Sequence, residues 1–138
     1  EQQVKIELRC AEELPKIQGD PGQIVQLFVN LLKNAIEAMP EGGTVTIEAD
    51  HSPSRVGPGS IVVRVLDEGT GIDPTARAKI FEPFCTTKPS GTGLGLSICR
   101  EIADFHRARL ALFPRSVIDG GTIAEVEFPS LAPEISGT

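Results

Sequence analysis

An amphipathic segment with clear start and stop signals is the feature that most constrains the fold of this chain. Asp20 precedes Pro21 and, three residues on, Gln23, which is the pattern of an N-cap, a first-turn proline and a capping box. The helix is therefore predicted from Pro21 to about Met39, where the run Pro40–Gly43 stops it. Its apolar stripe must pack on a second layer and contains Ile24, Leu27, Phe28, Leu31, Leu32, Ala35 and Ile36.

Short β-branched or alternating segments flank this helix and predict strands. They are Val4–Cys10, Leu14–Gln18, Thr44–Ala49, Ser60–Leu66, Leu110–Phe113 and Thr122–Phe128. Two further helices are expected, from Asp73 to about Ile80 and from Gly93 to Phe105. Loops rich in Pro, Gly, Ser or Thr should cover His51–Ser60 and Glu82–Thr92.

This order of elements predicts an α+β two-layer sandwich. The mixed sheet should have about five strands, covered on one face by about three α-helices, with hairpins closing both ends. A length of 138 residues fits one domain, expected over residues 1–129 with a frayed tail over 130–138. The chain starts without Met, so we expect it to be a piece of a longer protein.

Composition excludes several classes of partner. The net charge is −6, and aromatic residues are 4% with no Trp or Tyr, which disfavours nucleic acid and anionic membranes. Three cysteines without close spacing and two histidines make neither a disulfide framework nor a metal site of nitrogen and sulfur ligands. No signal peptide or apolar run of membrane-spanning length is present. A reducing, cytoplasmic compartment fits best.

Two asparagines mark the polar face of the predicted helix. Asn30 and Asn34 lie four residues apart, so their side chains stack on one face, although asparagine disfavours helix interiors. A solvated polar face explains such a pair, and so does a pair of neutral oxygens that hold Mg²⁺ beside a polyphosphate.

One acidic residue lies at the end of a predicted strand, directly before a glycine-containing turn. Asp67 follows the apolar strand Ser60–Leu66, and Gly69 and Gly71 follow Asp67. An ordinary turn with Asx hydrogen bonding explains this pattern. Alternatively, the Asp67 carboxylate accepts a hydrogen bond from a ligand amino group, and the glycines let the backbone approach a flat ligand.

A glycine run opens the last predicted helix, where free N–H groups and the positive end of the dipole attract anions. The run is Gly91-Thr92-Gly93-Leu94-Gly95-Leu96, and it matches neither the Rossmann fingerprint nor the Walker A loop. The preceding loop offers hydroxyls and one cation for terminal phosphate oxygens, namely Thr86, Thr87, Lys88 and Ser90. It is either a lid over a nucleotide or a plain surface loop.

Taken together, these segments resemble the ATP-binding domain of sensor histidine kinases, in the superfamily of DNA gyrase, the heat-shock chaperone ATPase and mismatch-repair ATPases (the Bergerat fold). Asn30–Ala35 is similar to the N box and Asp67–Ile72 to the first glycine box. Phe81–Phe84 is similar to the F box, Gly91–Leu96 to the second glycine box, and Gly120–Thr122 to a late glycine-threonine element. The resemblance covers about residues 4–129 and is greatest to the nitrogen-regulation and oxygen-sensing subgroup.

The resemblance implies roles for individual residues. Asp67 would bind the adenine amino group, with Thr122 near the base, and Asn30 and Asn34 would hold Mg²⁺ and phosphates. Lys88 and Thr87 would meet the γ-phosphate. The remaining nucleotide-binding positions would be Gly69, Gly71, Ile72, Thr86, Gly91, Gly93, Leu94, Gly95 and Leu96.

Two positions depart from the pattern of the family. Glu37 stands where many members carry Lys or Arg, so the phosphate charge must be met elsewhere, by Lys33 or Lys88. The usual His-Gly-Gly after the last helix is here His106-Arg107-Ala108, without the glycine-assisted turn.

The resemblance also orders the possible reactions. ATP hydrolases and serine kinases of this superfamily keep a Glu as general base where this chain has Asn30, and an amide cannot take a proton. Transfer of the γ-phosphoryl group to a histidine is therefore favoured, with a hydrolase, a serine kinase or a non-catalytic nucleotide sensor as alternatives. Neither His51 nor His106 has the context of an acceptor. We expect the acceptor on a dimerisation domain of the same parent protein, a response regulator downstream, and a monomeric fragment.

Overall fold

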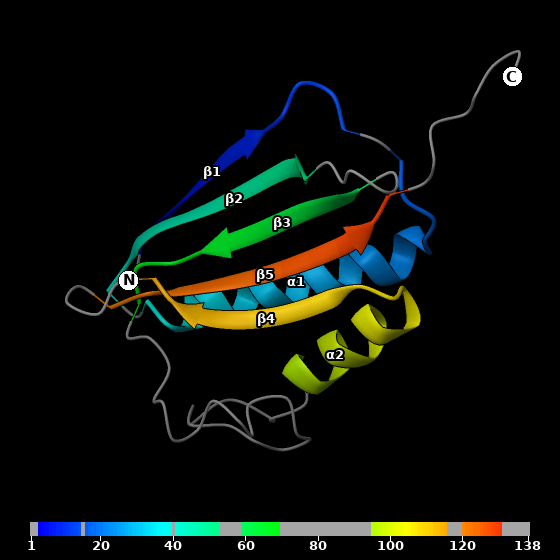
Figure 1. Cartoon of the computed structure of the whole chain (residues 1–138). Coiled ribbons are helices and arrows are strands. Elements are labelled where there is room, and N and C mark those ends of the chain that lie inside the picture. Colours follow the sequence, from blue (N-terminus) through cyan, green and yellow to red (C-terminus); the bar gives the residue numbers. More distant parts are fainter. Residues whose placement is uncertain are drawn as a thin grey trace, which may run out of the picture.

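A computed structural model describes residues 3–14, 16–39, 41–52, 59–69, 95–115 and 120–130. Within these ranges the chain forms five strands and two helices (Figure 1). The strands are β1 (Val4–Cys10), β2 (Gly43–Ser52), β3 (Ser60–Leu66), β4 (Arg109–Pro114) and β5 (Thr122–Pro129). The helices are α1 (Pro21–Glu37) and α2 (Gly95–Phe105). The predicted helix over 73–80 and most of the predicted lid lie outside the described residues.

The strands form one mixed sheet in the order β1-β2-β3-β5-β4. β1 and β2 are parallel because α1 connects them as a crossover, whereas the other neighbouring pairs are antiparallel. The prediction of a five-stranded mixed sheet is confirmed. Hairpins were predicted at both ends of the sheet. This prediction is wrong at the N-terminal end, where the edge strand β1 pairs with β2 in parallel.

The described residues of the connection from β1 to α1, 11–14 and 16–20, form no strand, which corrects the expectation for Leu14–Gln18. Ala11 still donates its N–H to Ala49 O at 3.0 Å, so sheet pairing continues one residue past β1 and then stops. Ile17 packs against the core from this connection. Its apolar side chain therefore serves packing, and the segment returns the chain to the start of α1.

The start of α1 is the one predicted. Asp20 Oδ1 accepts hydrogen bonds from the N–H groups of Gly22 and Gln23, at 2.9 and 3.2 Å. The helix ends at Glu37 with Ala38 as its C-cap, slightly before the predicted Met39. Met39 is 2% exposed and belongs to the core, so its burial extends the apolar stripe beyond the helix.

Both helices lie on one face of the sheet (Figure 1). The core between the layers includes Leu27, Leu31 and Ala35 from α1, together with buried residues of the sheet and α2. The other predicted stripe residues, Ile24, Phe28, Leu32 and Ile36, are partly buried against this core. This arrangement confirms a two-layer α+β sandwich for the part of the chain that the structure describes.

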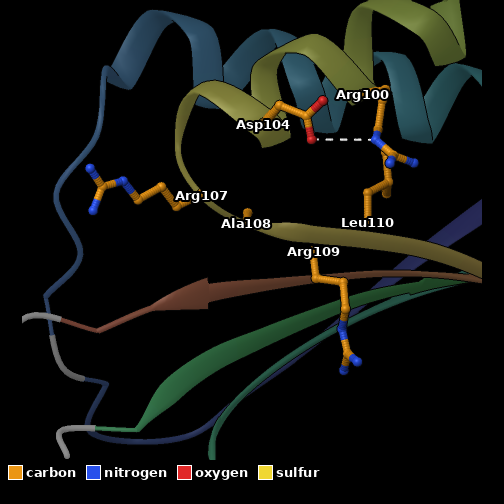
Figure 2. Close-up of a pocket in the computed structure, with 6 residues that line it drawn as sticks. All are labelled: Arg100, Asp104, Arg107, Ala108, Arg109 and Leu110. Atoms are coloured by element: carbon orange, nitrogen blue, oxygen red, sulfur yellow. Dashed lines mark ion pairs between the residues drawn. The ribbon is translucent and has the colours of Figure 1, made fainter.

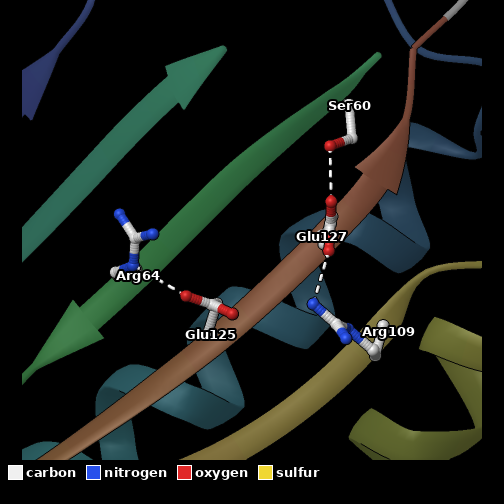
Figure 3. A network of polar contacts seen from close by, with 5 residues as sticks. All are labelled: Ser60, Arg64, Arg109, Glu125 and Glu127. Carbon is white, nitrogen blue, oxygen red and sulfur yellow. Dashed lines mark hydrogen bonds and ion pairs between the residues drawn. The ribbon is translucent and has the colours of Figure 1, made fainter. Parts of the chain in front are cut away.

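The opposite face of the sheet is polar. In β5 the buried residues Ala124, Val126 and Phe128 alternate with two glutamates, which point away from the helices. Glu125 binds Arg64 at 2.8 Å, and Glu127 binds Ser60 at 2.6 Å and Arg109 at 2.7 Å (Figure 3). These cross-strand pairs suit a solvated surface, and no described helix covers them.

The turn after α2 forms without the glycine that the family usually has there. Ala108 N–H donates to Ala103 O at 2.8 Å, and Arg107 N–H donates to Asp104 O at 3.1 Å. This is the hydrogen-bond pattern of a Schellman motif. Arg107 takes the left-handed conformation, with φ of 58°, that glycine normally supplies. The backbone therefore makes the turn that the sequence was expected to lose, at a cost in strain. None of the described helices is long and apolar enough to span a membrane.

Candidate nucleotide-binding site

The centre of the predicted site is the acid at the end of β3. Asp67 is 6% exposed. Its Oδ1 accepts hydrogen bonds from Gly69 N–H at 2.9 Å and Thr122 N–H at 3.1 Å. Its own N–H donates to Thr122 O at 2.9 Å. The structure thus brings together Asp67, Gly69 and Thr122, which the sequence analysis assigned to the same ligand.

Two glycines make this cluster possible. A Cβ at Gly69 would clash with the carbonyl of Ala38, so the turn after β3 packs directly against the C-cap of α1. Gly121 has a φ of +91°, and a Cβ there would lie 2.6 Å from Asp67 O. Gly121 N–H donates to Gly69 O at 2.9 Å. These glycines allow close approach between parts of the protein backbone, whereas approach to a ligand was the role predicted for Gly69.

The two predicted magnesium ligands lie on α1. Asn30 and Asn34 are both half-buried, so neither belongs to a freely solvated face. Asn30 hydrogen-bonds to the thiol of Cys99 in α2. Cys99 also donates to Leu27 O, with Sγ 3.6 Å from the oxygen. Asn30 therefore lies where the two helices pack, beside the helix that the glycine run opens.

The Cys99 thiol is held neutral by this environment. It is fully buried, and loss of hydration raises its pKa to about 12, while the hydrogen bond from Asn30 acts in the opposite direction. A thiol with this pKa stays protonated at neutral pH. It can therefore act as a hydrogen-bond partner for Asn30 and is a poor nucleophile.

Many of the predicted site residues lie outside the described residues. They are Gly71, Ile72, Thr86, Thr87, Lys88, Gly91, Gly93 and Leu94, and the F-box segment Phe81–Phe84 falls there too. Two described residues of the predicted site have not been placed yet, Gly95 and Leu96. Gly95 begins α2. Leu96 is half-buried and packs against the core.

A cavity of about 210 Å³ lies elsewhere, between the end of α2 and the start of β4 (Figure 2). Arg109, at the start of β4, pairs with Glu127, whereas Pro114 at its other end pairs with Thr122 beside Asp67. The cavity is therefore at the far end of β4 from Asp67. Arg100 binds Asp104 at 3.3 Å and Arg109 binds Glu127, while Arg107 and Arg109 point in different directions (Figure 2). These guanidinium groups do not converge on one ligand.

Sequence reasoning missed a buried histidine that joins the two helices. His106 is 7% exposed, and its Nε2 accepts the N–H of Asp20 at 3.0 Å. Its Nδ1 lies 2.8 Å from Ile102 O, so the neutral tautomer with hydrogen on Nδ1 satisfies both contacts. The N–H of Asp20, which a capping box would pair with Gln23, is thus taken by a residue 86 positions away. The capping-box pattern assigned this donor to Gln23, so no local signal pointed to His106 as its partner.

Comparison with known proteins agrees with this geometry. A buried acid lies at a strand end beside a glycine turn, and the neighbouring helix carries two half-buried amides. The sequence profile described as "Histidine kinase-, DNA gyrase B-, and HSP90-like ATPase" matches residues 19–132. This chain belongs to that family, and its ATP-binding domain is of the sensor histidine kinase type.

Individual relatives are sensor kinases. The C4-dicarboxylate transport sensor protein DctS of Rhodobacter capsulatus is 36% identical over 129 residues, which are 94% of this chain and 19% of DctS. The mycobacterial sensor histidine kinase MprB has a similar structure, with a TM-score of 0.82 and 26% identity over 94% of this chain and 83% of the MprB chain. Full-length ShkA, solved in complex with AMPPNP, has a TM-score of 0.75 and 30% identity over 94% of this chain and 26% of ShkA. The chain spans between 16% and 27% of the length of the curated relatives compared.

Proposed function

We propose that this domain binds Mg²⁺–ATP and donates the γ-phosphoryl group to a histidine on a dimerisation domain outside the sequence. In this reaction an imidazole nitrogen forms a bond to the γ-phosphorus, the bond to the bridging oxygen breaks, and ADP leaves. The parent would be a two-component sensor kinase, with a response regulator as the next acceptor and this domain in the cytoplasm. The sensor-kinase relatives support this proposal, and binding of AMPPNP by ShkA supports the nucleotide.

The choice between phosphoryl transfer to histidine and hydrolysis rests on the identity of residue 30. Asn30 is half-buried at the contact between α1 and α2, where it meets the Cys99 thiol. Neither an amide nor a neutral thiol accepts a proton from water at neutral pH, so this part of the site has no general base. Transfer to an external nucleophile therefore fits better than hydrolysis or serine phosphorylation, the second candidate within the same family.

Each side chain has a proposed part in binding. The Asp67 carboxylate accepts the adenine amino group, with Thr122 beside it. Asn30 and Asn34 hold Mg²⁺, which offsets the charge of the phosphates; two half-buried amides on one flank of a helix suit a hard cation with oxygen ligands. Thr86, Thr87 and Lys88 meet the γ-phosphate, with backbone access at Gly69, Gly71, Gly91, Gly93 and Gly95. Ile72, Leu94 and Leu96 line the base pocket.

Phosphorus NMR of the isolated domain with Mg²⁺ and ATP tests this function. We expect the ATP resonances to shift or broaden and the nucleotide to stay intact for hours, because the acceptor histidine is expected on another domain and residue 30 is an amide. Asn30→Glu restores a carboxylate, yet we expect no fast hydrolysis, since a water molecule must also be positioned. Rapid release of phosphate by the unmodified domain would establish the hydrolase. Unchanged ATP resonances at millimolar protein would contradict binding itself.

A further inference from the structure

An arginine outside the predicted site reaches the backbone of its central acid. Arg115 immediately follows β4, and its Nη1 donates a hydrogen bond to Asp67 O at 3.1 Å. Its own N–H donates to Gly121 O, also at 3.1 Å. The two residues are 48 positions apart in the sequence, so only the folded sheet brings this cation to Asp67.

The stem of the arginine lies against the glycine that separates it from Asp67. A Cβ at Gly121 would be 3.3 Å from both Cβ and Cδ of Arg115, and 2.6 Å from Asp67 O. The space that any other residue would fill at position 121 is therefore occupied by the Arg115 stem and the Asp67 carbonyl. The arginine passes over Gly121 and ends on the carbonyl.

The contact adds to a set of hydrogen bonds around Asp67. Its N–H and Oδ1 are both bound to Thr122, and Oδ1 is bound to Gly69. Its carbonyl comes after the last residue of β3, where the regular pairing with β5 has ended. Arg115 supplies a charge-assisted donor there, which is stronger than a neutral one.

We propose that Arg115 is a positioning residue, which holds the Asp67 peptide so that the carboxylate keeps the orientation needed to recognise the amino group of adenine. This inference rests on the adenine role proposed for Asp67. Because the arginine acts through Asp67 and not on the phosphates, it should affect recognition of the base selectively. Its exposed position means that replacement need not disturb the core.

Calorimetry with two triphosphates tests the role of Arg115. ATP carries the amino group that would donate a hydrogen bond to Asp67, and purine riboside triphosphate lacks this group. Arg115→Met keeps the stem and removes the guanidinium, and we expect it to weaken ATP binding by about fivefold, roughly 1 kcal/mol. Binding of purine riboside triphosphate should change by less than about twofold. Arg115→Gln keeps a neutral donor and should recover part of the ATP affinity.

Controls separate this inference from the proposed function. Arg9→Met removes the same charge from the exposed edge strand β1 and should change neither affinity. Equal affinities for ATP in Arg115→Met and the unmodified domain would refute the role of Arg115, as would an equal loss for both nucleotides. If the unmodified domain does not prefer ATP to the analogue, and Asp67→Asn has no effect, the adenine role of Asp67 fails and the inference fails with it.

Discussion

At the residue scale, Arg107 shows how a local rule is broken without loss of the turn. The family places glycine after the histidine that ends the helix, and this chain places an arginine there with φ of 58°. Left-handed backbone costs an ordinary L-residue about 1–2 kcal/mol, and glycine avoids that cost. The Schellman hydrogen bonds of Ala108 and Arg107 still form, so packing of α2 on the sheet outweighs the strain.

Arg107→Gly should therefore stabilise the domain. We expect its free energy of unfolding in urea to rise by about 1 kcal/mol relative to Arg107→Ala, because both variants lack the charged side chain and only one relieves the strain. Arg107→Ala itself should be neutral or slightly destabilising, since it removes a cation from a helix C-terminus. Equal stability of the two variants would show that the conformation carries no strain.

Asp67 and Asn30 show what could and could not be predicted for single residues. Both were predicted to be site residues because their types and spacing match a chemistry. The hydrogen-bond partner of Asn30 was not predicted, because Cys99 is distant in sequence and has no distinguishing local pattern. Thr122 was expected near the same ligand as Asp67, but the hydrogen bonds between these two residues were not predicted. The burial that raises the pKa of Cys99 to about 12 likewise depends on the packing of α1 against α2.

At the element scale, the buried histidine couples the end of α2 to the start of α1. His106 accepts the N–H of Asp20, the N-cap of α1. The ring also has edge contacts with Phe105 and Phe128, at centroid distances of 5.2 and 6.4 Å. A Cβ at Gly19 would lie 2.8 Å from the ring, so glycine leaves room for it.

His106→Phe should destabilise this junction. The replacement keeps an aromatic ring but loses the acceptor for the Asp20 N–H and the donor for Ile102 O, which we expect to cost about 1–3 kcal/mol in urea unfolding. In this variant, hydrogen exchange of the Asp20 amide should become faster, and the exchange of the β3 amides should be less affected. His51→Phe, on the exposed end of β2, is the matched control and should leave both measurements unchanged. Unaltered protection of Asp20 in His106→Phe would contradict the coupling.

The element boundaries follow from the strength of the local signals. β1 and β3 have the predicted bounds, and α1 starts where Asp20 and Pro21 indicate. β2 extends to Ser52, beyond the predicted Ala49, because its last residues pair with β3 through Ser60. β4 and β5 each extend slightly beyond their predicted ends for the same reason. Pairing between strands thus decides lengths that propensity leaves open.

At the scale of the whole molecule, nucleotide binding and folding are linked. A ligand that binds only the native state stabilises it by RT ln(1 + [L]/Kd), which is about 2.7 kcal/mol at a concentration of 100 Kd. ATP with Mg²⁺ should therefore raise the melting temperature of the isolated domain.

Asp67→Asn should reduce this stabilisation. We expect at least about tenfold weaker ATP binding, equivalent to about 1.4 kcal/mol, because an amide cannot offer the adenine amino group an ionised acceptor. At the same ATP concentration, the increase in stability should fall from about 2.7 to about 1.4 kcal/mol. Asp50→Asn, an exposed change of the same charge on β2, should retain the full effect. An undiminished ATP-induced shift in Asp67→Asn would rule out the adenine role.

The sequence by itself determined the class of fold, the local elements and the residue types of the candidate site. Hydrophobic periodicity, capping and glycine placement act over a few residues, so they can be read along the chain. Only the tertiary structure decided the parallel pairing of β1 with β2 and the contacts of Asp67 with Thr122 and Arg115. It also decided the contact of Asp20 with His106. These contacts join distant residues whose backbone donors and acceptors look alike in sequence, and burial in one packed sheet selects the partners.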